Sequence, residues 1–177
     1  MPAEPVAVAF ANTRSSRHRD RIETLDRWRA WSDARDGLRT VGRAVDADGL
    51  ADLRAVRDDV QELLRGAARG REPDPGAAER LLRLARASAP FGLGWRADRY
   101  ELTVPEHGTP AAAVAHHLAG AAVGLLVTGP PLAVCRGEDC LKVFVATRAD
   151  RRWCDSAACG NRARVRSHQR RRSGQDG

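Results

Sequence analysis

The chain has 177 residues, with 30 lysines and arginines against 23 aspartates and glutamates, and 42% of its residues are hydrophobic. This composition suits a soluble globular protein and argues against a disordered tail or a membrane protein. The charge is uneven, because residues 135–177 hold 11 of the basic residues, only 5 of the acidic ones and all four cysteines. The opening segment MPAEPVAVAF has no basic leader, so we expect a cytoplasmic protein with no membrane partner.

Apolar residues recur at helical spacing along the first part of the chain. A first helix is predicted over residues 19–34 and a second around residues 50–64, capped by Asp46 or Asp48 and stopped near Gly70. A third helix follows Pro73-Asp74-Pro75 and ends before Pro90. This part of the chain is therefore predicted to be mainly α-helical.

Between the third and fourth predicted helices the apolar period changes from helical spacing to strict alternation. The alternation covers residues 91–95 and 100–104 and predicts a small β-hairpin. A fourth helix is expected to begin at Thr109-Pro110 and to run to Val127. It contains His116 and His117 and is rich in alanine and glycine, so we expect a buried helix and not a membrane span.

The segment 128–131, Thr-Gly-Pro-Pro, is a natural domain boundary, since it can sustain neither a helix nor a central strand. We therefore predict a helical domain over residues 1–130, suited to sensing or dimerisation, and a zinc finger with a basic helix over residues 131–172. Residues 173–177 are predicted to be a flexible tail. The finger is expected to be small and of the treble-cysteine-turn type.

Four cysteines fall in two pairs with identical spacing, Cys135-x4-Cys140 and Cys154-x4-Cys159. Four thiolates suit a tetrahedral Zn(II) ion, and a module this short needs such a crosslink to fold. Two disulfides are the alternative, which the expected cytoplasmic setting disfavours. A redox pair is disfavoured because the spacing is not the two-residue gap of thiol oxidoreductases. We predict one zinc ion per chain.

The residues around these cysteines resemble the CGNR zinc finger, named after a tetrad present here as Cys159-Gly160-Asn161-Arg162. The first 130 or so residues are similar to the helical ABATE domain of stress-induced transcription regulators, through Phe10-Ala11-Asn12-Thr13-Arg14 and a helix containing Trp28. The resemblance implies a bacterial-type DNA-binding regulator. Asp155 departs from the serine that often follows the third cysteine, and we expect this departure not to affect zinc ligation.

The run NRARVRSHQRRR, residues 161–172, is predicted to form a helix of about three turns. Val165 is expected to mark its inner face with Asn161 and His168, while Trp153 forms the small core of the finger. Gly160 is expected to permit a tight turn and Asn161 to cap the helix or brace that turn. The candidate nucleic-acid contacts form an outward stripe with its flanks: Arg162, Arg164, Arg166, Arg170 and Arg171. Arginines nearer the cysteines, among them Arg136, Arg148, Arg151 and Arg152, are expected to offset the charge of the zinc centre, and Arg162 to share that role.

Arginine concentrated behind a zinc module on an otherwise nearly neutral chain favours DNA as the partner. RNA and a protein partner remain alternatives, and so does a solvated or disordered basic segment. Because a lone finger buries little surface, we expect two copies to act together as a homodimer.

No catalytic motif is apparent in the sequence, and we expect no enzymatic activity. Asn12, Thr13, Arg14 and Arg17 form a polar cluster that is a candidate site for an anion or a small-molecule effector. The alternative is that this cluster is a capping and surface segment.

Overall fold

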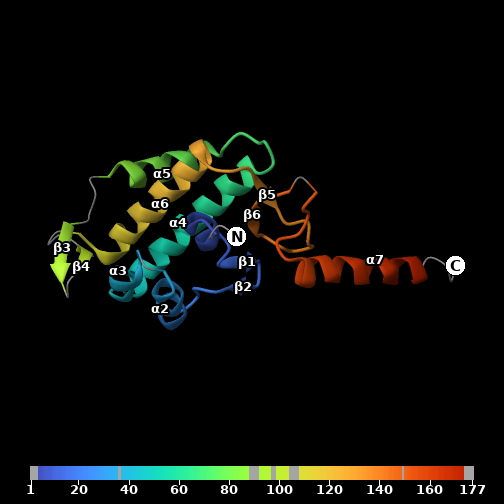
Figure 1. The fold of residues 1–177 in the computed structure, drawn as a ribbon, viewed down its shortest axis with the longest axis horizontal. Coiled ribbons are helices and arrows are strands. Elements are labelled where there is room, and N and C mark those ends of the chain that lie inside the picture. Colours follow the sequence, from blue (N-terminus) through green and yellow to red (C-terminus); the bar gives the residue numbers. More distant parts are fainter. Residues whose placement is uncertain are drawn as a thin grey trace.

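The computed structural model describes residues 4–35, 37–87, 92–96, 99–103, 108–148 and 150–173. The helices of the N-terminal part are α1 (Val6–Ala11), α2 (Leu25–Asp33), α3 (Arg39–Arg43), α4 (Ala47–Ala67), α5 (Pro75–Arg86) and α6 (Pro110–Thr128). Near the C-terminus a π-helical turn η1 (Ser156–Gly160) continues as α7 (Asn161–Ser173). Ser173, which was predicted to begin the flexible tail, is therefore helical, and the rest of that tail lies outside the described residues. The fold is mainly α, as predicted, and Figure 1 shows α4, α5 and α6 side by side.

Three antiparallel strand pairs accompany the helices in the described residues: β1 (Arg14–Ser16) with β2 (Arg19–Asp20), β3 (Gly92–Arg96) with β4 (Arg99–Thr103), and β5 (Leu132–Val134) with β6 (Val143–Val145). The β3–β4 pair is the predicted hairpin, with Leu93 opposite Leu102 and Trp95 opposite Tyr100. Phe91 and Val104, which were also assigned to it, lie outside the described residues.

The long helices begin where their caps predict. Asp46 accepts a hydrogen bond from the Gly49 amide at the start of α4, and Thr109 accepts one from Ala112 at the start of α6. The prediction of a helix from residue 19 is wrong, because residues 19 and 20 form β2 and α2 begins only after Thr24. Ile22 is still fully buried, so its apolar character reflects core packing and not helical periodicity.

Helix α6 is long and apolar enough to cross a membrane by length and composition alone. In the fold it packs against α1, α3, α4 and α5, and its first half supplies buried residues such as Val114 and Leu118. This position is that of the core helix predicted for the segment.

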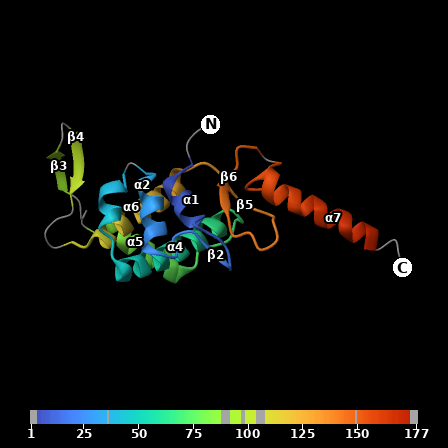
Figure 2. The same ribbon diagram turned by 90° about the horizontal axis from the view of Figure 1, so that it is seen from below.

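Helix α1, a short element that the sequence analysis did not predict, lies at the centre of the core. Val8 and Phe10 have no exposed surface, and α1 contacts α4, α6 and strand β6. Figure 2 shows α1 between the helical body and the β5–β6 pair. The beginning of the chain therefore joins the helical body to the C-terminal module.

Candidate metal centre and basic helix

The β5–β6 hairpin has one face on the helical body and the other on the cysteines. Val143 is fully buried in a cluster with helices α1, α4, α5 and α6, whereas its neighbour Phe144 packs with the buried Cys135 and Cys159. Adjacent residues of a strand point to opposite faces, so Val143 packs into the core of the helical body while Phe144 packs into the core of the finger. The hairpin thereby places the cysteine cluster directly against the body.

The four cysteine sulfurs converge on one point. The Sγ atoms of Cys135, Cys140, Cys154 and Cys159 all lie within 4.8 Å of one another, with 3.9 Å between Cys140 and Cys154 and 3.7 Å between Cys154 and Cys159. Zn–S bonds of about 2.3 Å in a tetrahedron put sulfurs about 3.8 Å apart. The donor set and its spacing fit a structural zinc ion held by four cysteines.

Hydrogen bonds to sulfur orient the ligands. The amides of Gly137 and Cys154 each donate to Cys135 Sγ at 3.4 Å, and the Arg162 guanidinium donates to Cys159 Sγ at 3.1 Å. The bond to Cys159 raises the pKa of Arg162. Donors of this kind disperse the negative charge of a four-thiolate centre, and Arg162 therefore acts on the metal site.

Contacts among the cysteines and burial shift the pKa values of their thiols in different directions. The contact with the Cys154 thiol lowers the pKa of Cys140 to about 5, while the same contact raises the pKa of Cys154. Burial raises the pKa of Cys135.

Three residues whose structural roles were not predicted from the sequence shape the two cysteine turns. A Cβ on Gly137 would lie 3.2 Å from Cys159 Sγ, so a side chain here would crowd this ligand sulfur, and glycine leaves it room. Asp139 has a φ of 58°, in the left-handed region that aspartate tolerates better than most residues. Asp155 accepts hydrogen bonds from the amides of Ala157 and Ala158 and caps η1. Only Asp155 drew comment from the sequence, and its capping role was not recognised.

Two further side chains hold the finger together. The Arg151 guanidinium lies over the Phe144 ring at 4.4 Å and donates to the carbonyl of Cys154 at 2.8 Å. Trp153 is half-buried against Gly160, where a Cβ would lie 3.1 Å from Trp153 Cδ1. Trp153 thus belongs to the small core, and Gly160 allows its close approach.

Helix α7 leaves the finger and projects away from the rest of the molecule (Figure 1). The prediction of an inner face at Val165 is wrong: its side chain is 48% exposed, and Asn161 and His168 are exposed as well. Asn161 directly follows η1, and the capping aspartate is Asp155. Because the helix projects, α7 has no body against which to bury such a face.

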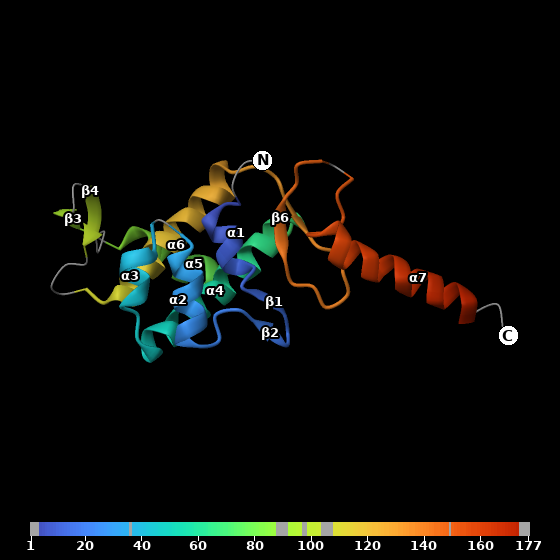
Figure 3. The ribbon, with the colours of Figure 1, turned by 60° about the horizontal axis from the view of Figure 1, so that its bottom comes forward.

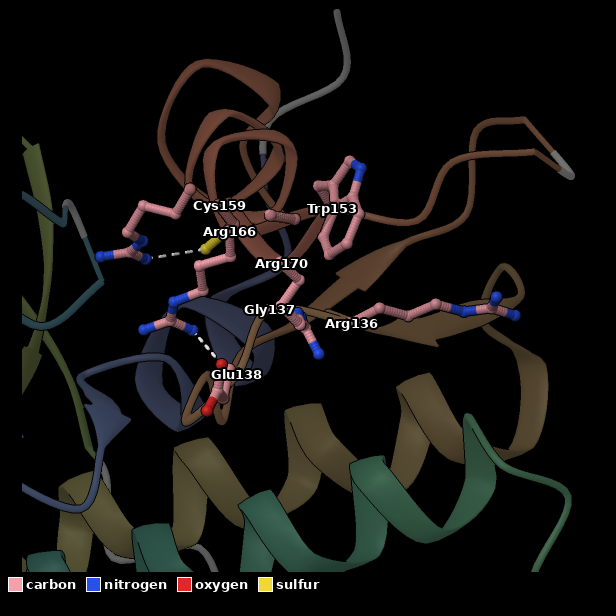
Figure 4. A pocket seen from close by; sticks show the side chains of 9 residues that line it. Arg136, Gly137, Glu138, Trp153, Cys159, Arg166 and Arg170 are labelled. Atoms are coloured by element: carbon pink, nitrogen blue, oxygen red, sulfur yellow. Dashed lines mark hydrogen bonds and ion pairs between the residues drawn. The ribbon is translucent and has the colours of Figure 1, made fainter. Parts of the chain in front are cut away.

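The arginines of the predicted stripe have different local partners. Arg166 forms an ion pair with Glu138, which Figure 4 shows beside Trp153 and Cys159. Arg164 donates to the carbonyl of Ser156 at 3.4 Å, and Arg171 donates to the Ser167 hydroxyl at 3.3 Å. Among the described residues, the outer arginines of α7 have no acidic partner: Arg170, Arg171 and Arg172.

The polar cluster near the N-terminus is largely engaged within the fold. The Asn12 amide donates to the Val143 carbonyl at 2.8 Å and accepts from the Val143 amide at 2.9 Å, and the buried Thr13 hydroxyl donates to the Phe10 carbonyl. Arg14 pairs with Asp58. Of the four residues in this cluster, only Arg17 is fully exposed, at the β1–β2 turn. The structure thus uses Asn12 to join the body to the finger.

Comparison with protein families agrees with this architecture. Residues 4–129 match ABATE, described as a "Putative stress-induced transcription regulator", and residues 132–172 match the CGNR zinc finger. The chain is therefore a member of the ABATE family that carries a C-terminal CGNR zinc finger, and it is a zinc-binding protein of regulator type. No curated protein matches the chain.

Proposed function

We propose that this protein is a cytoplasmic, non-enzymatic transcription regulator that binds DNA through α7. The observation that carries the proposal is the exposure of this helix: α7 has 13 residues, projects from the body and contains no acidic residue. Its length of about 20 Å suits entry into the major groove, which is about 12 Å wide. Arginines along its surface would contact phosphates and base edges.

The zinc centre sets the direction of α7. Asp155 and Cys159 lie in the turn that starts the helix, so closing the cysteine cluster fixes the helix relative to the body. When bound, zinc supplies a rigid crosslink between the two cysteine turns. Specific recognition by so small a surface would require two copies, and we propose a homodimer formed through the N-terminal domain. Light scattering under binding conditions tests this, since a particle of only 19.2 kDa contradicts it.

A salt titration tests DNA binding. The zinc-loaded full chain is measured against a random-sequence duplex between 50 and 200 mM salt, alongside Arg170→Ala/Arg171→Ala. Each lost phosphate contact lowers the slope of log K against log salt by about 0.9, so the double variant should lose close to 2 units. The matched control is Arg83→Ala/Arg86→Ala on the surface of α5, which removes the same charge.

Absence of duplex binding at low salt would overturn the proposal. Equal slopes for the α7 double variant and the parent would show that α7 does not contact the phosphates. Tighter binding to single-stranded RNA than to duplex DNA would favour the RNA alternative.

A further inference from the structure

The β1–β2 hairpin of the N-terminal domain lies next to the first turns of α7. Figures 1 and 3 both place β1 and β2 beside the start of this helix. A groove runs between them; its lining includes His18 and Arg19 from the hairpin, Lys142 from the finger, and Arg162 and Arg166 from α7. The groove is therefore lined by residues from both regions of the chain, the ABATE domain and the CGNR zinc finger.

Backbone and side-chain contacts fix the hairpin relative to the finger. The Leu141 amide donates to the Ser15 carbonyl at 3.0 Å, and the Arg65 guanidinium donates to the Leu141 carbonyl. The two hydrogen bonds between Asn12 and Val143 join the segment just before the hairpin to strand β6 of the finger. The hairpin and α7 are thus presented as one surface.

The hairpin side of this surface is basic. Arg17 and His18 form the two-residue turn and Arg19 begins β2, and all three are exposed. Neither Arg17 nor Arg19 has an acidic partner among the described residues. The nearby Asp20 forms ion pairs with Arg54 and Arg57 of α4.

The acidic residues that line the groove all lie on the finger. Glu138 pairs with Arg166, and Asp155 is used as the cap of η1; Asp139 occupies the strained position in the first cysteine turn. A polyanion in the groove would therefore run along the hairpin and stay away from these acids and from the zinc thiolates. A helix lying in the major groove has a phosphate backbone on either side, so an element beside its first turns faces one of these backbones.

We infer that the β1–β2 hairpin is a second nucleic-acid contact, in which Arg17 and Arg19 bind the phosphodiester backbone that flanks α7. This inference rests on the proposed function. It gives the N-terminal domain a direct part in binding and couples the position of that domain to the nucleic acid. Base recognition stays with α7, because the hairpin contacts only phosphates.

The test is a salt titration of the zinc-loaded full chain on the random-sequence duplex, comparing Arg17→Ala/Arg19→Ala with Arg83→Ala/Arg86→Ala. Loss of two phosphate contacts should lower the salt slope by about 1.8 and weaken binding at 50 mM salt, while the α5 control should match the parent. Near-equal weakening on unrelated duplex sequences is expected, since phosphate contacts carry no sequence information.

If the hairpin variant keeps the parent slope while Arg170→Ala/Arg171→Ala loses slope, the inference is wrong and DNA binding by α7 stands. If the parent itself does not bind, both are wrong. Circular dichroism and the zinc content of the hairpin variant guard against misfolding. Arg17→Lys/Arg19→Lys, which keeps both charges, should restore most of the slope.

Discussion

The arginines of α7 differ in what they contact. Some bond to groups of the zinc finger, and others are free to contact another molecule. Arg162 was predicted to serve both, and its guanidinium lies on Cys159 Sγ. Arg166 is held by Glu138, whereas Arg170 and Arg171 lie further along the helix with no acidic partner among the described residues. The arginines form a regular stripe in the sequence, but in the structure those near the finger have partners within the fold and those further along α7 have no acidic partner among the described residues.

Replacing Arg162 tests its role at the metal. Arg162→Ala removes a charge-assisted bond to a ligand sulfur and should weaken zinc binding by about 10- to 100-fold, as loss of an outer hydrogen bond to a metal ligand commonly does. Competition with a chromogenic chelator measures the change. Arg164→Ala is the matched control, because the Arg164 guanidinium donates to the Ser156 carbonyl and not to a sulfur. Equal zinc affinity of the two variants would contradict the role.

If α7 binds DNA as we propose, Glu138 competes with phosphate for Arg166. Glu138→Gln keeps the size of the side chain but removes its charge, and should therefore raise affinity for duplex DNA and increase the salt slope by about one unit. The same titration as above measures both quantities. Asp150→Asn, which removes an exposed charge from elsewhere in the finger, controls for net charge. An unchanged slope in Glu138→Gln would show that Arg166 does not reach the DNA.

At the scale of elements, the junction between η1 and α7 decides where the basic helix points. Asp155 caps this junction through two backbone amides, and their hydrogen bonds lower the pKa of its carboxyl group. Because the pKa is lowered on folding, the contribution of this cap is complete above the ordinary pKa of aspartate and is lost as pH falls through the lowered value.

Removing the cap should loosen the start of α7. Asp155→Ala is expected to lower the thermal midpoint of the zinc-loaded chain by a few degrees at neutral pH, and Asp155→Ser, which keeps a capping oxygen, should lose less. Thermal scans across pH measure the difference from the parent, which should shrink under acid. A difference that grows as pH falls would contradict the sign of the pKa shift.

The sequence predicted those elements that are specified by residues close together in the chain, such as capping residues, alternating apolar residues and paired cysteines. The caps Asp46 and Thr109, the alternating residues of β3 and β4 and the paired cysteines each point to one structure. Helix α1 was missed because its six residues, VAVAFA, are all apolar and show no periodicity. Val165 was assigned to an inner face because a period shows which residues share a face but not whether anything packs against it.

At the scale of the whole molecule, the two family regions share one core. Val143 of the finger is buried among helices of the body, and Asn12 bonds to both backbone groups of this residue. The domain boundary at residues 128–131 therefore separates two families in sequence but not two independent bodies in space. Zinc loading and the stability of the helical domain should be coupled through this contact.

Asn12→Ala tests the coupling. It leaves the buried amide and carbonyl of Val143 without partners, at a cost of about 1–3 kcal/mol for each unsatisfied group. Chemical denaturation of the zinc-loaded chain should report this loss, and chelator competition should show faster zinc release. Glu4→Ala is the matched control, since it removes the remaining hydrogen bond of Asn12 at the surface but keeps both bonds to Val143. Equal stabilities of the two variants would contradict a shared core.

The link between Asn12 and Val143 also bears on how the chain folds as it is synthesised. Helix α1 leaves the ribosome before β6, yet it packs against that strand, which is made more than 130 residues later. The contacts of α1 therefore remain incomplete until residues 143–145 have emerged. A nascent chain stalled before residue 143 would expose the surface of α1 that β6 covers, so the packing of α1 is completed only once the finger has been made.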